Sequence, residues 1–241
     1  MMGWRARLGF LVPPGNPTVE PEMMQLAPLG VSLHFSRLIA SGSTGTPEGQ
    51  EARNRSYLAH IDDSAALLAM VHPNVIVLAH TASSYTLGQE AEQALITRLE
   101  QQSGARVITA AGAVLQAFAQ LGVHKIALAT PYPETISQQS RAYLEAHGLQ
   151  VVSYGRLDNV RNIYEETAAR AYHLARQVDT PEAEAVFISG TGLPTLAVLD
   201  MLEHDLRKPV FSSATAMMWL ALRTARVGSC ISGYGCLMAT V

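Results

Sequence analysis

Three apolar segments in the first half of the chain recur, in the same order, in the second half. The matched pairs are residues 7–14 with 125–132, 75–82 with 185–192, and 106–113 with 209–216. One such pair could be chance, because buried strands resemble one another, but three pairs in one order indicate a duplicated unit. The chain is therefore predicted to contain two similar halves, residues 1–118 and 119–241, with one C-terminal segment able to pack across the approximate boundary.

Continuous apolar runs alternate with longer helical patterns in both halves. The predicted strands cover residues 8–12, 75–79, 107–110, 126–129, 186–189 and 210–213. The predicted helices cover residues 49–72, 88–102, 113–121, 133–147, 163–178 and 195–206. Apolar strands separated by helices are typical of a parallel sheet covered on both faces. We therefore predict an α/β fold of two pseudo-symmetric, doubly wound (Rossmann-like or flavodoxin-like) parallel-sheet halves, with a site in the cleft between them.

Composition excludes several classes of protein. The 241 residues are 48% hydrophobic and 15% charged, which is the range of a globular protein. A net charge of −3 provides no field suited to nucleic acid or to an anionic membrane, and no apolar stretch reaches the roughly 18 residues that span a bilayer. With no signal-peptide pattern and only two cysteines, we expect a cytoplasmic protein without a disulfide framework. Helices rich in Ala and Leu favour a homo-oligomer.

Polar side chains follow nearly every predicted strand. In two parallel sheets that face one another, the carboxyl ends of the strands meet at one cleft, which here predicts a site built from residues 13–18, 80–84, 130–132, 189–193 and 212–215. Hydroxyls and amides at such turns can hold carboxylate or enolate oxygens. Ordinary turn and cap chemistry is the alternative explanation. The candidate group is Asn16, Thr18, Thr81, Ser83, Ser84, Tyr132, Ser189, Thr191, Ser212 and Ser213.

His80 is the only side chain at these strand ends whose reference pKa lies near neutral. An imidazole held directly after an apolar strand could act as a general base or acid, or it could simply pack there. The spacing of the histidines predicts no metal site, and the proline-rich 12–17 segment lacks the glycine pattern that binds dinucleotides or phosphates. We therefore expect neither a metal nor a nucleotide cofactor.

Several of these segments resemble one known family. The resemblance is carried by residues 7–13, 16–20, 107–113, 126–132, 208–210 and 233–235. Together they are similar to the maleate isomerase and arylmalonate decarboxylase branch of the Asp/Glu racemase superfamily. The resemblance implies the pseudo-symmetric fold, the absence of organic cofactors and metals, and substrates that are small dicarboxylates or amino acids.

The same resemblance implies roles for individual residues. By position, Asn16 matches a carboxylate-holding asparagine, Tyr132 a tyrosine that donates to a carboxylate or enediolate oxygen, and Asn162 a second asparagine. Thr81 and Thr191 match positions whose backbone amides or hydroxyls face the substrate. The family places cysteines at two pseudo-symmetric positions, or at the second alone, where this chain has His80 and either Gly190 or Thr191. Cys230 and Cys236 fall outside both motifs, so thiolate chemistry is not expected.

The leading hypothesis is a cofactor-independent isomerase or decarboxylase-like lyase acting on a small carboxylate through an enediolate-type intermediate. His80 is the predicted proton-transfer group, with Thr191 and Tyr132 as further catalytic residues. The predicted substrate-binding residues are Asn16, Pro14, Thr81, Ser83, Asn162, Ser189, Gly190 and Gly192. The alternative is a carboxylate-binding or regulatory protein that has lost the catalytic cysteines.

Overall fold

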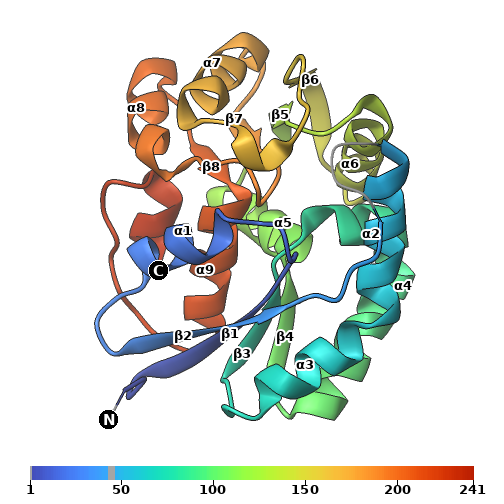
Figure 1. The fold of residues 1–241 in the computed structure, drawn as a ribbon. Coiled ribbons are helices and arrows are strands. Elements are labelled where there is room, and N and C mark those ends of the chain that lie inside the picture. The colour runs from blue at the N-terminus through green and yellow to red at the C-terminus, as the bar shows by residue number, and fades with distance from the viewer. Residues whose placement is uncertain (1, 43–46) are drawn as a thin grey trace.

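The computed structural model, which describes residues 2–42 and 47–241, contains two four-stranded parallel sheets (Figure 1). The first sheet has the order β2-β1-β3-β4 and the second the order β6-β5-β7-β8. The strands are β1 (Ala6–Val12), β2 (Val31–Arg37), β3 (Val75–Leu78), β4 (Arg106–Thr109), β5 (Lys125–Thr130), β6 (Gln150–Arg156), β7 (Ala185–Ile188) and β8 (Val210–Ser212). The α/β fold predicted from the repeat is confirmed, because both sheets repeat one topology.

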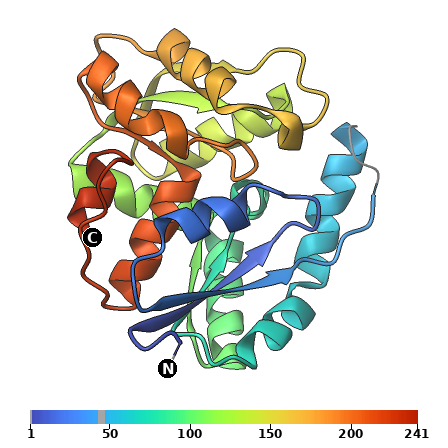
Figure 2. The same cartoon turned by 60° about the vertical axis from the view of Figure 1, so that its left-hand side comes forward.

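Helices cover the sheets and fill the space between them. The first half carries α1 (Val19–Leu26), α2 (Pro47–Ala59), α3 (Ile61–Ala69), α4 (Thr81–Ser103) and α5 (Ala110–Leu121). The second carries α6 (Glu134–Ala146), α7 (Ala168–Val178), α8 (Leu196–Leu206), α9 (Ser213–Thr224) and the short 3₁₀ helices η1 (Ile163–Glu165) and η2 (Cys236–Thr240). Figure 2 shows the two sheets as separate lower and upper layers of the molecule. None of the described helices is both long and apolar enough to cross a membrane.

Burial explains which strands the sequence pattern could predict. The central strands β3 and β7 are buried at every position, and all six predicted strands are present. The edge strands β2 and β6 mix apolar and polar residues and are mostly half-buried, so their pattern does not stand out from a loop. An edge strand has a neighbour on one side only and needs less apolar surface.

The helix predictions were wrong in several details. The predicted helix 49–72 is two helices, α2 and α3, which are separated at His60. The predicted 88–102 helix begins earlier, at Thr81, and bends at Gly88, whose φ of 73° and ψ of 172° are not helical. Residues 163–167 form η1 and two extended residues, Glu166 and Thr167, instead of the start of the 163–178 helix. The sequence analysis missed α1 and α9; in α9 nearly every residue is buried, so it lacks the polar stripe that marks a surface helix.

Helix α9 ties the two halves together. It packs against α5 and also contacts α1, β3 and β4, although it follows the last strand of the second sheet (Figure 1). Met217, Met218, Trp219 and Leu222 on α9 are buried in one hydrophobic core that includes residues of both sheets. Full burial of each such side chain contributes about 1.5–3 kcal/mol. The division of the chain at residue 118 stays a prediction.

Two buried carboxylates also bridge the halves. Glu22 of α1 accepts hydrogen bonds from the backbone amides of Thr195 and Leu196 at the start of α8, at 2.6 and 3.1 Å. Glu92 of α4 accepts a 2.6 Å hydrogen bond from the Tyr143 hydroxyl of α6. Burial raises the pKa of Glu22 to about 7, and the hydrogen bonds from α8 oppose that shift.

Candidate active site

The strand order places four loops at one meeting point. In each sheet the second strand lies on one side of the first and the third strand on the other, so the strand order reverses between β1 and β3 and between β5 and β7. Ligands of open parallel sheets bind outside such switch points. Asn16 follows β1, His80 follows β3, Tyr132 follows β5 and Thr191 follows β7. The fold therefore brings together residues that lie up to 175 positions apart.

Hydrogen bonds join these loops across the two halves. The Asn16 side-chain amide donates to the backbone oxygen of Thr191 at 3.2 Å, and the Thr81 and Tyr132 hydroxyls pair at 3.0 Å. The Thr18 hydroxyl donates to the backbone oxygen of Gly192 at 3.0 Å. The inner end of the cleft is therefore closed by polar contacts between the halves.

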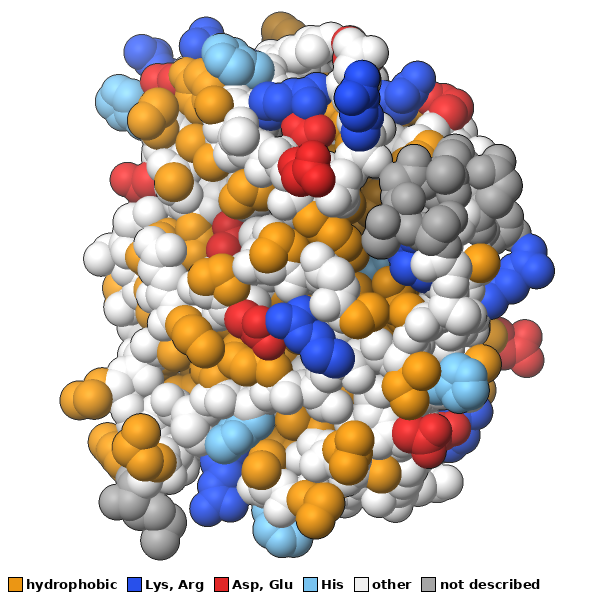
Figure 3. All heavy atoms as spheres, in the orientation of Figure 1, with side chains coloured by type: hydrophobic (Ala, Val, Ile, Leu, Met, Phe, Trp, Pro, Cys, Tyr) orange, Lys and Arg blue, Asp and Glu red, His pale blue; other side chains and the backbone are white. Residues whose placement is uncertain are grey.

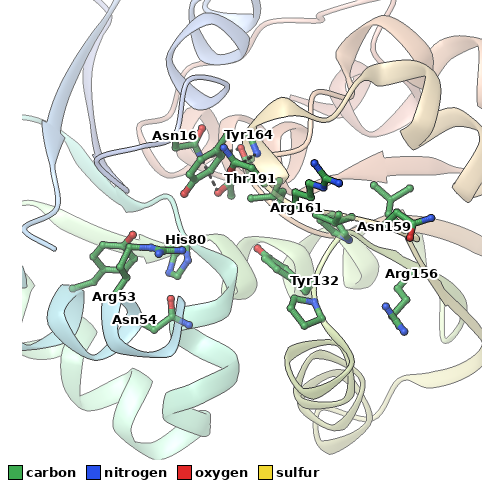
Figure 4. A pocket seen from close by; sticks show the side chains of 18 residues that line it. Asn16, Arg53, Asn54, His80, Tyr132, Arg156, Asn159, Arg161, Tyr164 and Thr191 are labelled. Atoms are coloured by element: carbon green, nitrogen blue, oxygen red, sulfur yellow. Dashed lines mark hydrogen bonds between the residues drawn. The ribbon is translucent and has the colours of Figure 1, made fainter. Parts of the chain in front are cut away.

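A cavity of about 300 Å³ opens at this junction, and Figure 4 shows the side chains of the 18 residues that line it. From the loops already named it takes Asn16, His80, Tyr132, Thr191 and Gly192. Helix α2 and the segment that runs from the end of β6 to η1 form the remaining wall. The face shown in Figure 3 intersperses basic and acidic side chains, without a large field of either sign.

His80 lies at the N-cap position of α4 and is 7% exposed. Its Nδ1 pairs with the Ser83 hydroxyl at 2.8 Å, and its ring meets the Tyr57 ring edge-on, with centroids 5.2 Å apart. Burial, and after it the positive charge of Arg53, together lower the pKa of His80 to about 4. The imidazole is therefore neutral near pH 7, with Nε2 as the ring nitrogen left for a ligand.

The N-terminus of helix α4, with its partial positive charge, lies beside His80. The first backbone N–H groups of a helix have no intrahelical acceptor, and they carry the positive end of the helix dipole. The His80 side chain makes no capping hydrogen bond to these amides. The N-terminus of α4 thus stabilises negative charge next to His80.

Tyr132 faces His80 from the other half of the molecule (Figure 4). Its ring is 4% exposed, and burial raises the pKa of its hydroxyl well above the usual 10. The phenol is therefore neutral throughout the physiological range. Because the Thr81 hydroxyl can donate to it, the Tyr132 proton is available to an oxygen in the cavity.

Asn16 and Thr191 are largely engaged by other protein groups. The Asn16 side-chain oxygen accepts from the backbone amides of Thr18 and Val19, at 2.8 and 3.1 Å, while its amide donates to Thr191. The Thr191 hydroxyl donates to the backbone oxygen of Ala79 at 3.0 Å. Both residues line the cavity, and their contacts hold the loops that form it.

Gly190 stands after β7 in the place that His80 takes after β3. Its φ of +98° is a conformation that favours glycine, and a Cβ atom there would lie 2.8 Å from Cγ of Pro131. Its backbone amide donates to the Ser213 hydroxyl at 3.1 Å. The position has no room for a side chain, so this face of the cavity carries no acid or base at residue 190.

The structure brings together six of the eleven predicted site residues and leaves the other five outside the cavity wall. The lining group is Asn16, His80, Tyr132, Asn162, Thr191 and Gly192. Thr81 and Ser83 lie behind the wall as partners of Tyr132 and His80. The remaining three are Ser189, which pairs with Tyr85, Gly190, and Pro14, which is exposed. Residues 212–215 were also expected at the site, but they form the end of β8 and the capped start of α9.

Sequence reasoning missed the contribution of α2 and of the segment after β6. Arg53, Asn54 and Tyr57 of α2 line the cavity, as do Arg156 and Arg161. Among the described lining residues there are three arginines and no Asp or Glu. Arg156 is ion-paired with Glu134 at 3.1 Å, so part of this charge is neutralised, and the remaining excess of basic side chains favours an anionic ligand. The basic residues in 53–57 and 156–161 could have indicated a binding site for an anion, but the sequence does not show which way their side chains point.

No group of three His, Cys, Asp or Glu side chains in the described residues could hold a metal ion. The two cysteines are exposed residues outside the cavity lining. Partial burial of the thiol, together with Glu203, raises the pKa of Cys236 to about 12. That thiol is therefore protonated at neutral pH and is a poor nucleophile.

The fold and cavity define a class: duplicated α/β proteins that bind a ligand between two parallel sheets. Within that class, the chain belongs to the arylmalonate decarboxylase family, whose model matches residues 8–238. It is 30% identical to the maleate isomerase of Nocardia farcinica over 98% of this chain and 96% of that protein. It is also 30% identical to the arylmalonate decarboxylase of Bordetella bronchiseptica, over 95% and 94% of the two chains.

Solved structures agree with these sequence matches. The crystal structure of arylmalonate decarboxylase has a TM-score of 0.80 at 26% identity and covers 98% of this chain and 100% of its own. The Nocardia farcinica maleate cis-trans isomerase bound to TRIS has a TM-score of 0.87 at 27% identity and covers 97% and 98% of the two chains. The family resemblance expected from the sequence is confirmed.

Proposed function

We propose that this protein is a cofactor-independent decarboxylase or isomerase of a small dicarboxylate, in which His80 transfers the proton through an enediolate-type intermediate. The observation that carries the proposal is the placement of His80 and Tyr132 from opposite halves in one cavity with three arginines. Relatives named maleate isomerase and arylmalonate decarboxylase support the substrate class and the two reaction types.

The proposed decarboxylation is a two-step reaction. The bond between the α-carbon and one carboxylate breaks, CO₂ leaves, and the electron pair moves into the remaining carboxylate as an enediolate. The Tyr132 hydroxyl and the α4 amides stabilise the enediolate oxygens. His80 then donates a proton from Nε2 to the α-carbon, and water returns a proton to His80.

The final protonation requires His80 in its protonated form, and a bound dianion stabilises that form. Burial and Arg53 favour the neutral form of His80, whereas two carboxylates bound beside it favour the imidazolium. Ligand binding thus raises the pKa of His80 and loads it with the proton that it later donates. In the isomerase variant of the proposal, the substrate is a β,γ-unsaturated dicarboxylate: His80 removes its α-proton, which leaves an enediolate, and returns the proton to the γ-carbon, so that the double bond moves by one position.

The location of the cysteines favours decarboxylation or a proton shift over a thiol adduct. One structural neighbour is a maleate cis-trans isomerase mutant with a covalently bound succinylcysteine intermediate. In this chain both cysteines lie outside the cavity lining, and no side chain fits at Gly190. A single protonated His80 is sufficient for protonation of an enediolate.

One observation supports a second candidate, a carboxylate-binding or regulatory protein without turnover. His80 is neutral, buried and hydrogen-bonded to Ser83, and a histidine with a purely structural role has the same properties. In that case Asn16 and Tyr132 serve binding alone. The two candidates differ in whether a ligand is converted or only stabilises the fold.

Proton NMR in deuterated water separates these candidates. The wild-type protein is incubated with methylmalonate, phenylmalonate and maleate, each in a separate sample. We expect a monocarboxylate with deuterium at its α-carbon from each malonate and no product with His80→Gln. Maleate serves as the unreacted control, because its conversion to fumarate needs a nucleophile that adds to the double bond and not a proton shift. Thermal stabilisation by these ligands without any product would contradict the enzyme proposal and favour the binding protein.

A further inference from the structure

Helix α2 presents one polar side chain to the cavity that nothing in the described structure satisfies. Asn54 is 4% exposed and lines the cavity, and none of the described residues forms a hydrogen bond with its carboxamide. In Figure 4 it lies below His80, with its amide turned toward the cavity. Its carboxamide atoms are not among the polar atoms that are fully enclosed without a partner, so they are open to the cavity, where a ligand or water can bond with them. A ligand that covered this amide without bonding to it would cost about 1–3 kcal/mol.

The charge around Asn54 indicates the kind of group that it meets. Arg53 precedes it on α2 and is close enough to His80 to lower the pKa of that histidine. Arg161 lines the same cavity, and so does Arg156, whose guanidinium is ion-paired with Glu134 at 3.1 Å; no acidic side chain is among the described lining residues. An anionic oxygen is favoured in this field, and it accepts the hydrogen bond that the Asn54 –NH₂ group can donate.

We infer that Asn54 is a substrate-binding and specificity-determining residue that donates a hydrogen bond to the second carboxylate of a dicarboxylate. This inference rests on the proposed function and assigns that carboxylate to the α2 side of the cavity. A methyl or aryl group in the same place would leave the carboxamide buried without a partner. Sites that hydrogen-bond a polar group reject analogues lacking that group far more strongly than apolar pockets reject one methylene.

Two ligands that differ by one group test this role. Maleate carries two carboxylates, and (Z)-but-2-enoate carries a methyl group in place of one of them. Binding of each is measured by calorimetry with the wild type and with Asn54→Leu, which keeps the approximate volume and removes the donor. We expect the variant to bind maleate about 10- to 100-fold more weakly and (Z)-but-2-enoate within about twofold of the wild type.

A charge-matched pair of variants covers the case in which Asn54→Leu does not fold. Asn54→Asp keeps the shape, cannot donate, and should weaken maleate more than (Z)-but-2-enoate. Asn74→Asp makes the same substitution at the opposite end of β3, where Oδ1 still accepts from the Arg7 backbone amide, and should leave both affinities unchanged.

Each outcome has a definite meaning for the assignment. Equal losses for the two ligands, or maleate affinity within twofold of the wild type in the Asn54 variants, would overturn the role of Asn54 while leaving the proposed function in place. If the wild type binds maleate with the expected dependence on Asn54 but converts no carboxylate, the assignment stands and the proposed enzyme fails. If the wild type binds neither ligand at millimolar concentration, both are wrong.

Discussion

The segments that follow β3 and β7 occupy equivalent places in two sheets of one topology, yet they are built differently. After β3 the chain enters α4 at once, with His80 at the N-cap position and the helix amides beside it. After β7 it turns through Gly190, at a φ of +98°, and α8 begins only at Leu196. One segment offers a titratable ring and a helix terminus, while the other offers a tight turn.

The turn after β7 makes hydrogen bonds that hold the start of α4 in place. From the turn after β7, the Thr191 hydroxyl donates to the backbone oxygen of Ala79, the residue before His80. Its backbone oxygen accepts from Asn16, and the Tyr132 hydroxyl of the same half pairs with Thr81. Under the proposed mechanism the two halves have different roles: the first carries His80 as the proton-transfer group, and the second contacts the start of α4 and completes the cavity.

The largest expected effect comes from comparing a substitution of His80 with a substitution of Thr191. His80→Ala should lower turnover about 10²- to 10⁴-fold, because general acid–base groups contribute that much. Thr191→Val should cost about tenfold or less, because the hydroxyl supplies one neutral hydrogen bond worth about 0.5–1.5 kcal/mol. Steady-state kinetics of both variants, with folding checked by circular dichroism, gives the comparison. An equal loss from Thr191→Val would assign the proton step to both halves.

The pH dependence of stability should show His80 and Glu22 acting in opposite directions. His80 has a pKa of about 4 in the folded state against 6.5, so the unfolded chain binds its proton first, and the stability from neutral His80 is lost as pH falls from 6.5 to 4. Glu22 has a pKa of about 7 against 4.5, so its contribution is present below 4.5 and is lost as pH rises through 7.

Each of these contributions amounts to about 3 kcal/mol. Urea unfolding of the wild type, His80→Gln and Glu22→Gln at pH 4, 5.5 and 8 measures them. The His80 variant should lose less stability than the wild type on acidification, and the Glu22 variant should lose less between pH 5.5 and 8. A wild-type profile that neither substitution changes would show that both groups titrate normally.

Substitution of Asn16 should separate binding from turnover. Asn16→Ala removes the amide that joins the halves and should weaken carboxylate binding by about 1.5–3 kcal/mol, with a smaller effect on maximal rate. The variant also loses the acceptor for the Thr18 and Val19 amides, which should cost about 1 kcal/mol of folding stability. Calorimetry with maleate on the folded variant is the measurement, and unchanged affinity would exclude a role for Asn16 in binding.

The glycine of the second segment should resist substitution because of its surroundings as well as its φ. Gly190→Ala forces a Cβ against Pro131 in a left-handed conformation and should destabilise the fold by about 1–3 kcal/mol. Gly104→Ala is the matched control, with a φ of +68° and no atom within 4 Å of the added Cβ, and should cost about 1 kcal/mol. Equal losses in thermal unfolding would show that Pro131 does not restrict this position.

Sequence patterns predicted what depends on burial and on chain order. Central strands such as β3 are apolar throughout, and the repeated segments located the switch-point loops that carry His80 and Tyr132. The edge strands β2 and β6 were missed because their residues are mixed, whereas the edge strands β4 and β8 were predicted from their apolar runs. Helix α9 was missed because it is buried on nearly every side. These properties are set by neighbours that the local sequence does not contain.

The missed part of the site has the same explanation. Asn54 lies on a mostly polar helix, α2, and only the packing of that helix against the first half turns the residue toward His80. Arg156 ends an edge strand that the pattern did not show. Conversely, Ser189 was a reasonable candidate, but its hydroxyl pairs with Tyr85, a partner 104 positions away. The division at residue 118, the homo-oligomer and the cytoplasmic location stay predictions.

The most direct test of the account is solvent-deuterium incorporation after alkylation of the cysteines. The protein is treated with excess iodoacetamide at alkaline pH, because the Cys236 thiol is protonated at neutral pH, and labelling of Cys230 and Cys236 is verified by mass spectrometry. After return to neutral pH, α-deuteration of the product from methylmalonate is followed by NMR. Both cysteines lie outside the cavity lining, so we predict an unchanged rate after alkylation and loss of the signal in His80→Ala. Loss of deuteration on alkylation, with His80→Ala still active, would contradict the histidine mechanism.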